Sequence, residues 1–499
     1  MVQTFSSALS YANIELDELK AESFQKNITE YAPKNLLGVC YPTSERDVRK
    51  VIALANEMDF KLMPISSGRN WGLGSKLPIT DHPTLIVDLR KMNKILEINT
   101  VHNYVVIEPG VTQEQVHQML TKKGINLCVN VTGSGKNTSI AGNLLDRGVG
   151  IQGQRTKDLN ALEVVLGNGK LIKTGFGHFD QKSDDRRYHY LHGIGPDMTH
   201  LFTQSNYGIV TKLVVKLYPI AECTLLLYEV AEENLHEFVN TVAYLRQRSV
   251  VPDTFEINSQ NDPRLFRLKE SENYQEHDKE CWFVWGALLG TKRIRSAVEE
   301  DLKEYLGKLC LNQYYFNTEN TPEEISEPLQ VRFDRLKGIP GDHSLLTMAE
   351  VYNIELDPNT DIDVDMHKEV PGFIAILPAV PSDGEMVLKT INLLRDISEK
   401  HDFQSTITFS LVQENIYEGF IRCYFDRNNP EDVKKAHHWS LECHKELEKL
   451  DIFPYRVNNL DMDYFINRPE DEYNATIRDL GKTLDPNNVI APGKYCINY

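Results

Sequence analysis

The chain has 499 residues, of which 41% are hydrophobic, so it can bury a large core, and we expect two domains. Its 72 acidic and 54 basic residues give a formal net charge of −18, which repels nucleic acids and anionic membranes, so no nucleic-acid partner is expected. The N-terminal segment has no basic region followed by an apolar core, and no stretch reaches the about 20 apolar residues of a bilayer span. We therefore expect a cytoplasmic protein without a membrane partner.

A helix, a strand and a glycine-rich loop open the first clear unit. Ser44 and Asp47 have the spacing of a capping box, and the apolar residues after them recur with the period of a helix. The apolar run at 61–65 predicts a strand. The loop at 66–74 has glycines that let backbone N–H groups point at a phosphate, but it lacks the spacing of a P-loop or a Rossmann turn. Alone, it is as typical of a surface loop as of an anion site.

A second loop of similar composition favours the anion-site interpretation. It runs from Val131 to Thr138 with the sequence VTGSGKNT and leads into Gly142-Asn143. Two such loops in one domain indicate a bound dinucleotide.

Strands and helices continue to alternate around these loops. Strands are predicted at 84–88 and 104–108, and a capping box at Thr112 opens a helix. A hairpin is predicted at 161–174, and we expect positive φ angles in its turn, Gly167-Asn168-Gly169. Up to about residue 220, the pattern predicts one α+β domain.

From Cys223 onward, the pattern predicts a second α+β domain. Its expected elements are strands at 225–230, 281–289 and 373–380, and helices at 233–248, at 294–309 and after Asn429-Pro430. Trp282, Phe283 and Trp285 lie on alternate faces of one predicted strand, which favours a core role over a substrate cage.

Six motifs follow one another along the chain: PISSGRNWGLG, IEPGV, GNLLDRGVG, ALEVVLGNGKLIKTG, FTQSNYGIVTK and DPNNVIAPGK. This ordered set resembles the vanillyl-alcohol oxidase and 4-cresol dehydrogenase flavoproteins, a family of FAD-binding PCMH-type oxidoreductases. The resemblance implies an α+β fold in which a two-part PCMH-type FAD-binding domain carries an α+β cap domain with an antiparallel sheet. The expected boundaries are 1–220 for the main part of the FAD domain, 221–455 for the cap and substrate domain, and 456–499 for the tail that completes the FAD domain.

The resemblance also implies site residues. FAD would be held by Ser66, Ser67, Gly68, Arg69, Asn70, Trp71, Gly72, Thr132, Gly133, Ser134, Asn137, Thr138, Gly142, Asn143, Gly208, Ile209, Val210 and Lys494. Tyr455 and Arg456 match the pair with which the family holds a substrate phenolate, and a phenol beside a guanidinium is a suitable oxyanion or carboxylate clamp. The alternative is that Arg456 is structural and bridges the cap and the tail.

Other positions depart from the family pattern. Two tyrosines expected around the substrate are replaced by Leu73 and Ile151, and the acidic residue expected beside the flavin falls on Ser134. These changes argue against a simple 4-hydroxybenzyl substrate. The position of the family's covalent flavin link falls on Phe373, which would line the substrate pocket, and the first loop has no histidine. We therefore predict non-covalent FAD.

Some polar clusters are set aside. The eight cysteines contain no CxxC pair, so neither disulfides nor a zinc site is indicated, and no metal is expected. His437, His438, Cys443 and His444 are interpreted as a solvated helix face. The acidic stretch 355–365 lacks the glycine and glutamate of a calcium loop and is interpreted as a polar loop.

The leading functional hypothesis is an FAD-dependent oxidase or dehydrogenase that transfers a hydride from a small organic substrate to the flavin. Aromatic and carboxylate-bearing compounds are the candidate substrates, and oxidation at an alcohol, an amine or a C–H bond stays open. The first alternative is a tailoring oxidase of secondary metabolism that accepts a bulkier, non-phenolic substrate. The second is a flavin-binding subunit whose catalytic apparatus has decayed. The resemblance implies a homodimer or a larger homo-oligomer.

Overall fold

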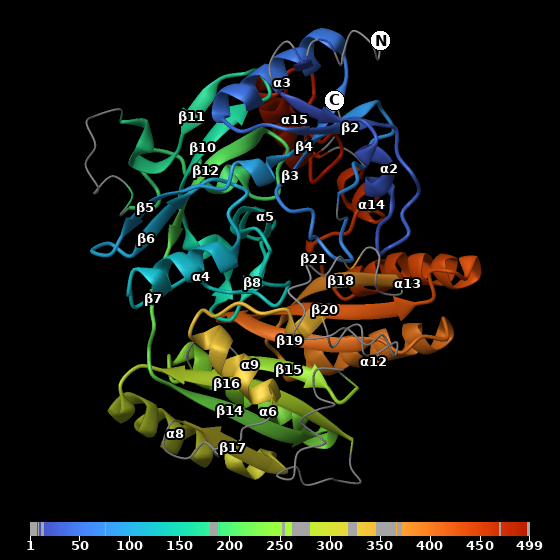
Figure 1. The fold of residues 1–499 in the computed structure, drawn as a ribbon. Coiled ribbons are helices and arrows are strands. Elements are labelled where there is room, and N and C mark those ends of the chain that lie inside the picture. Colours follow the sequence, from blue (N-terminus) through green and yellow to red (C-terminus); the bar gives the residue numbers. More distant parts are fainter. Residues whose placement is uncertain are drawn as a thin grey trace.

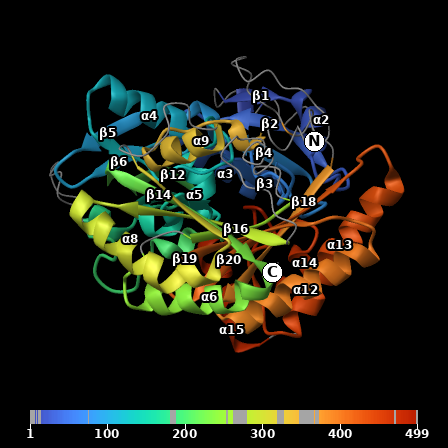
Figure 2. The ribbon, with the colours of Figure 1, turned by 90° about the horizontal axis from the view of Figure 1, so that it is seen from below.

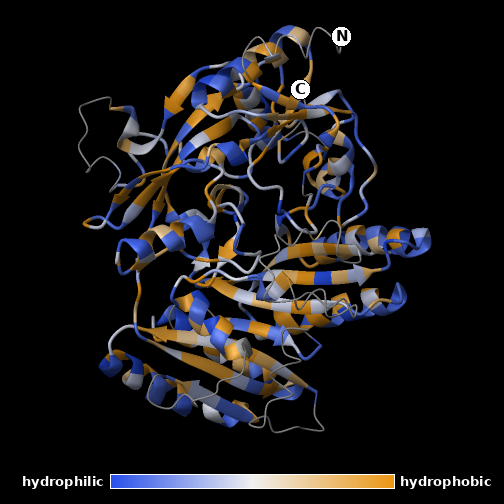
Figure 3. Cartoon of the chain, viewed as in Figure 1, coloured by the Kyte–Doolittle hydropathy of each residue, from blue (hydrophilic) through white to orange (hydrophobic). Residues whose placement is uncertain are grey.

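The structure is a computed structural model that describes residues 7, 9–10, 14–74, 76–179, 188, 190–251, 255–261, 280–317, 327–345, 366, 372–468 and 471–496. Figure 1 shows two parts. The upper part contains the first half of the chain and the last helices, and the lower part contains the middle of the chain. Figure 3 shows apolar residues concentrated on the strands of both parts and polar residues along the helices.

The first sheet of the upper part has the order β1-β2-β4-β3. Its strands are β1 (Glu15–Asp17), β2 (Leu36–Tyr41), β3 (Lys61–Ile65) and β4 (Thr84–Asp88). Helix α3 (Glu45–Met58) connects β2 to β3, and the Ser44 side chain caps it by accepting from the Asp47 amide. Strands β2 and β3 both pair with β4 in parallel, and the predicted helix α3 makes the crossover between them. The predicted strand β3 then ends at the first glycine loop.

The second sheet of the upper part is antiparallel, with the order β11-β10-β12-β6-β5. Its strands are β5 (Ile95–Asn99), β6 (Tyr104–Ile107), β10 (Leu159–Leu166), β11 (Leu171–Lys173) and β12 (Gly208–Lys216). The predicted hairpin is β10 to β11. Within Gly167-Asn168-Gly169, the expectation of several positive φ angles was wrong, because only Gly169 of the three has one, at 78°.

Short elements flank the second glycine loop along the chain. Helix α4 (Gln113–Lys122) begins with the predicted capping box, in which Thr112 and Gln115 bond each other's backbone. The loop continues into α5 (Ile140–Leu145). Smaller elements are α2 (Lys20–Gln25), β7 (Leu127–Cys128), β8 (Val149–Gly150), β9 (Gly153–Gln154), β13 (Tyr218–Pro219) and the 3₁₀ turns η1 (Leu89–Lys91), η2 (Arg155–Asp158), η3 (Gly175–His178) and η5 (His200–Phe202).

The lower part is built on a large antiparallel sheet, with the order β17-β14-β16-β15-β19-β20-β18-β21. Its strands are β14 (Cys223–Ala231), β15 (Phe255–Ser259), β16 (Cys281–Leu289), β17 (Asn312–Phe316), β18 (Gly372–Pro381), β19 (Thr406–Gln413), β20 (Ile416–Phe425) and β21 (Pro454–Arg456). The predicted antiparallel cap sheet is therefore confirmed.

Helices lie on both faces of this sheet, as the view from below shows (Figure 2). One face carries α6 (Glu232–Gln247), α8 (Lys292–Leu306) with η7 (Gly307–Leu309), α12 (Gly384–Lys400) and α13 (Pro430–Glu448) over the largest apolar core. The other face carries α9 (Glu327–Leu336), whose Leu329 and Phe333 pack against β14 and β16. Trp282 faces the first core and Trp285 the second, as their alternation predicted, but Trp285 also borders a cavity, so for this residue the predicted core role is only part of its environment.

The C-terminal tail returns to the first sheet. After α14 (Met462–Ile466) and α15 (Glu472–Leu484), the backbone of Leu62 accepts from Ala491 and donates to Val489, both at 2.7 Å. Val489 and Ile490 join the core around β2, β3 and β4. The division at residues 220 and 455 stays a prediction. Among the described residues, no helix is both long and apolar enough to cross a membrane.

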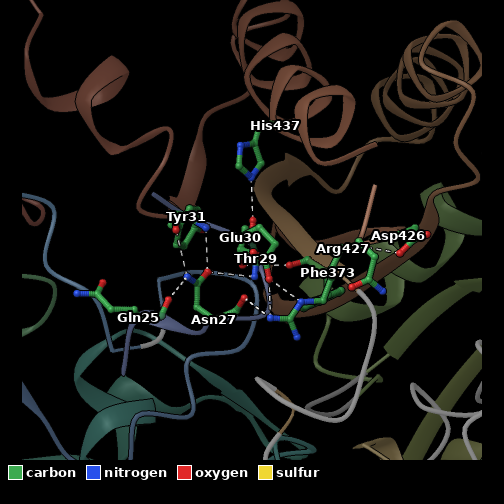
Figure 4. Close-up of polar contacts among 10 residues, drawn as sticks. Gln25, Asn27, Thr29, Glu30, Tyr31, Phe373, Asp426, Arg427 and His437 are labelled. Atoms are coloured by element: carbon green, nitrogen blue, oxygen red, sulfur yellow. Dashed lines mark hydrogen bonds and ion pairs between the residues drawn. The ribbon is translucent and has the colours of Figure 1, made fainter. Parts of the chain in front are cut away.

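The N-terminal segment also contacts the lower part (Figure 4). Thr29 donates from its hydroxyl to the Phe373 carbonyl at 3.0 Å, and its own carbonyl accepts from His437 at 2.7 Å. Arg427 bridges Glu30 and the Asn27 carbonyl. This segment therefore fixes the start of strand β18, where Phe373 lies.

The expectation of a solvated helix face at His437, His438, Cys443 and His444 was wrong for the last two residues. Cys443 and His444 are buried on α13, and His444 Nε2 lies 3.5 Å from Asp461. Burial lowers the pKa of His444. The acidic stretch 355–365 lies outside the described residues.

Candidate active site

A large cavity separates the two parts of the molecule. One side, which we call the loop face, consists of the glycine loops 66–73 and 131–143 with Asp146, Arg456 and Lys494. The other side, the sheet face, consists of side chains from strands β15, β16, β18, β19 and β20 and from helix α9.

The cavity brings together nearly all of the residues singled out from the sequence. It is lined by Ser66, Ser67, Gly68, Arg69, Asn70, Trp71, Thr132, Gly133, Ser134, Thr138, Gly142, Asn143, Gly208, Ile209, Val210 and Lys494, by Tyr455 and Arg456, and by Leu73, Ile151 and Phe373. Gly72 and Asn137 do not line it. At Gly72, a Cβ would lie 2.4 Å from the Phe373 ring, so this glycine allows close packing instead.

The two glycine loops are tied to one another. The Trp71 indole donates to the Ser134 carbonyl at 3.3 Å, and the Ser67 hydroxyl accepts from the Ser139 amide at 3.3 Å. Gly68 adopts a φ of 68°, which favours glycine and lets the first loop turn sharply after β3. The loops therefore act as one surface.

Gln113, which is fully buried at the start of α4, holds the second loop from behind. Its side-chain amide donates to the carbonyls of Gly135, at 2.7 Å, and Thr132, at 3.1 Å, and its oxygen accepts from the Thr132 amide at 3.2 Å. These bonds use both ends of the amide, so they fix the backbone on either side of Gly133 and Ser134.

The loop face fits a polar, phosphate-bearing cofactor. The hydroxyls of Ser134 and Ser205 are buried at the cavity without a hydrogen-bond partner among the described residues. Such groups need a partner, because burying a hydroxyl without one costs about 1–3 kcal/mol. At Gly142, a Cβ would lie 2.4 Å from Ser66 Oγ, so only glycine lets the loops approach this closely.

Arg456 is held by its neighbours on the loop face. Its Nη2 donates to Asp146 at 2.6 Å and to Asn70 at 2.9 Å, and Asn70 also bonds Asp146. Burial alone would raise the pKa of Asp146, but Arg456 and Lys494 outweigh burial and lower it. Arg456 is therefore ion-paired within the protein and links β21 to the first half of the chain, whereas the structural alternative predicted a bridge to the tail.

Tyr455 lines the cavity next to this pair. Burial raises the pKa of its phenol, so the group stays protonated and can donate a hydrogen bond. Its carbonyl accepts from Gln204 at 2.8 Å, which attaches β21 to the upper part of the molecule.

Glu418 on β20 is a site residue that sequence reasoning missed. It lines the cavity and is 4% exposed, and burial raises its pKa to about 7 against the opposing effects of Arg456, Arg147 and a hydrogen bond from Gln154. Gln154 donates to Oε1 at 2.7 Å and accepts from Thr156, which fixes its amide orientation. The other oxygen, Oε2, has no hydrogen-bond partner in the part of the chain that the structure describes.

The rest of the sheet face is also polar. On β19 and β20, alternate residues point into the cavity: Thr408 and Ser410, and Glu418, Phe420 and Arg422. On β15, Glu256 is paired across the sheet with Trp285 of β16 and Ser410 of β19, so it lies on the same face as they do. Polar residues at every second position of apolar strands are the signal that could have identified this face from the sequence.

Two of the three apolar substitutions, Leu73 and Phe373, lie together. Leu73 and Phe373 share a small core with Leu377 and contact the partly buried Tyr455, and Ile151 lies between the cores of the two parts. The Phe373 ring also packs against Phe420 and Tyr424. An apolar patch therefore lies beside the polar sheet face.

Comparisons with known proteins agree with this arrangement. The family model described as an FAD binding domain matches residues 36–175. The 4-cresol dehydrogenase [hydroxylating] flavoprotein subunit of Pseudomonas putida is 25% identical over 99% of this chain and 94% of its own length. The chain is an FAD-binding homologue of this flavoprotein. The 1'-carboxy-chondrochloren decarboxylase of Chondromyces crocatus is 27% identical over 98% of this chain and 96% of its own length.

Solved structures show the same fold. Substrate-bound p-cresol methylhydroxylase superposes with a TM-score of 0.85 at 23% identity, covering 100% of this chain and 96% of the other. The 4-ethylphenol oxidase from Gulosibacter chungangensis gives a TM-score of 0.85 at 22% identity, with the same coverage. The predicted PCMH-type fold is confirmed, FAD is the cofactor, and the chain is an FAD-dependent oxidoreductase.

Proposed function

We propose that this flavoprotein oxidises a small aromatic or carboxylate-bearing substrate, held between the loop face and the sheet face, with non-covalently bound FAD. Bound FAD supplies the hydride acceptor. The protein must then bind the substrate, orient it and remove a proton. The observation that carries the proposal is the buried Glu418 carboxylate in the cavity, with a pKa of about 7 and one oxygen available.

Glu418 has the properties of a general base. Above a pH of about 7 its carboxylate is ionised, and Oε2 can accept the proton that a substrate hydroxyl or amino group releases as the adjacent carbon loses its hydride. Gln154 keeps Oε1 in place, so Oε2 has a defined direction. The protonated phenol of Tyr455 can donate to the substrate oxygen or carboxylate, and Arg456 and Asp146 position the adjoining backbone.

The lining of the cavity supports non-covalent attachment. Phe373 has no nucleophilic atom, and among the described residues no histidine or cysteine lines the cavity. The nucleophiles that do line it include Tyr455 and Tyr495, and burial raises both of their pKa values, which suppresses the reactive phenolate.

A tailoring oxidase for a bulkier, non-phenolic substrate is the second candidate. The apolar side chains of Leu73, Ile151 and Phe373 in the cavity lining favour it, because they offer no partner to a phenolate. The relative that is a 1'-carboxy-chondrochloren decarboxylase adds carboxylate-bearing compounds to the substrates worth testing. The cytoplasmic location and the homo-oligomeric state stay predictions.

The test has two steps. A flavin spectrum whose colour is released by acid precipitation supports non-covalent FAD, whereas colour in the pellet contradicts it. Anaerobic titration with aromatic acids, alcohols and amines should then bleach the flavin. A flavin that no member of the series bleaches would favour the decayed binding subunit over either oxidase.

A further inference from the structure

A chain of hydrogen bonds reaches the Glu418 carboxylate from the other part of the molecule. Gln154 lies on β9 in the upper part, and its amide donates to Oε1 of Glu418 on β20 in the lower part at 2.7 Å. Strand β9 packs against β19, which is the neighbour of β20 in the large sheet. The side chain that contacts the proposed base therefore comes from the part of the molecule that carries the glycine loops.

The next member of the chain is Thr156, which lies in the 3₁₀ turn η2 and is buried. Its hydroxyl donates to Gln154 Oε1 at 3.0 Å. A side-chain amide has one acceptor end and one donor end, so the proton from Thr156 on the oxygen directs the NH₂ group toward Glu418. The reversed amide would place its oxygen against a carboxylate oxygen, which is repulsive while Glu418 is ionised.

The backbone on both sides of Gln154 is also held. On one side, the Asn130 side chain donates to the Gly153 carbonyl at 3.2 Å. On the other side, the ring of His200 bridges the Thr156 carbonyl, at 3.3 Å from Nε2, and the Asp197 carboxylate, at 2.7 Å from Nδ1. The short segment that carries the chain of hydrogen bonds is therefore fixed independently of Glu418.

We infer that Gln154 and Thr156 are positioning residues, which hold Oε1 of Glu418 so that Oε2 is left for the substrate. The inference rests on the proposed function for the identity of Glu418 as the base. Neither Gln154 nor Thr156 is among the residues that line the cavity, so both act through Glu418 and Thr156 acts through Gln154. The upper part of the molecule thereby aligns a base that belongs to the lower part.

This arrangement predicts how Thr156 affects the ionisation of Glu418. Without the Thr156 proton, the amide of Gln154 is free to reverse and to accept a hydrogen bond from the protonated carboxyl. That bond favours the neutral form, whereas the native bond from the NH₂ group favours the carboxylate. The other titratable groups that act on Glu418 are Arg456 and Tyr455 on β21 and Arg147 after α5.

The experiment follows the protonated Glu418 carboxyl by infrared spectroscopy of the FAD-loaded protein over a pH range centred on 7. The carbonyl band of this group is identified by its loss in Glu418→Gln. Thr156→Val keeps the shape of the side chain without its hydroxyl and should raise the midpoint of the band by about one pH unit, whereas Thr156→Ser should restore the native midpoint. Thr476→Val is the matched control and should not move it, because that hydroxyl bonds the Glu472 carbonyl on the exposed side of α15.

A double-mutant cycle tests whether Thr156 acts through Gln154. Gln154→Leu removes the donor to Glu418 and should raise the midpoint by itself, and Thr156→Val should then add no further shift. An unmoved midpoint in Thr156→Val, or a shift that persists in full in the Gln154→Leu background, would overturn the inference. FAD content and thermal unfolding are measured for each variant, and Thr156→Ala replaces Thr156→Val if the valine protein does not fold.

The infrared midpoint does not depend on turnover, so the inference and the proposed function fail separately. If the midpoint shifts as expected but flavin reduction is insensitive to Glu418→Gln, Thr156 and Gln154 control the carboxylate and Glu418 is not the base. If flavin reduction depends on Glu418 but the midpoint is unmoved in Thr156→Val, the proposed base stands and the positioning role is refuted. If both hold, the pH profile of flavin reduction should shift with the infrared midpoint.

Discussion

On the loop face, a buried ion pair is completed within the protein, whereas on the sheet face a buried carboxylate keeps one oxygen available to a ligand. Arg456 pairs with Asp146 at 2.6 Å, and the glycine loops offer backbone and hydroxyl groups. Across the cavity, burial raises the pKa of Glu418 to about 7, and its Oε2 has no hydrogen-bond partner among the described residues. The loop face is therefore suited to holding a cofactor, and Glu418 on the sheet face to deprotonating a substrate.

The largest expected effect is on the sheet face. Glu418→Gln should lower the rate of flavin reduction by about 10²- to 10⁴-fold, the usual contribution of a general base, while FAD stays bound. In the native protein this rate should rise with pH through about 7. Stopped-flow reduction with any substrate that bleaches the flavin measures both. Glu414→Gln, at an exposed glutamate between β19 and β20, should have no effect.

Glu418→Gln should raise the stability of the protein although it lowers the rate of flavin reduction. The pKa of Glu418 rises from 4.5 to about 7 on folding, so its contribution is intact below pH 4.5 and is lost as the pH rises through 7. Glutamine does not ionise, so Glu418→Gln has no such loss of stability at high pH. The variant should therefore be more stable than the native protein at pH 8 by up to about 3 kcal/mol and should show no extra stability at pH 4.5. A variant that is less stable at pH 8 would mean that Glu418 is a structural residue.

The contrast between the faces also explains what the sequence could reveal. The loop face depends on local signals: glycines and hydroxyls in short segments, and capping boxes at Ser44 and Thr112 that fix the helices beside them. The apolar strand β18 and the helix α13, which begins after Asn429 at Pro430, were likewise identified from their own residues. These features require no knowledge of distant neighbours.

The sheet face could not be assembled in that way. Glu418 becomes a base only because folding buries it next to Gln154 and Arg456, which are far away in the sequence. Arg332 becomes a cavity residue because α9 packs on β14 and β16. For the same reason, the sequence identified Arg456 as a candidate but not Asp146, the partner that neutralises it.

The ion pair of the loop face provides the next largest effect. Arg456→Ala leaves Asp146 buried without its main cation and should destabilise the protein by about 3–5 kcal/mol in denaturant unfolding. Adding Asp146→Asn should recover most of that loss, because the uncompensated charge is gone. If Arg456→Ala instead left stability unchanged and abolished ligand binding, Arg456 would be the substrate clamp predicted from the sequence, and the contrast between the two faces would fail.

The smallest expected effect separates cofactor binding from chemistry. Gln113→Leu removes the bonds that hold Thr132 and Gly135 and leaves buried backbone groups unsatisfied, so FAD affinity should fall about tenfold. At saturating FAD, flavin reduction should keep its native rate, because Gln113 does not touch the sheet face. Gln118→Leu, on the exposed side of the same helix, controls for changes in α4 and should leave FAD affinity unaltered. A slower reduction at full FAD occupancy would show that the second loop also orients the substrate, and the division of labour between the two faces would then be incomplete.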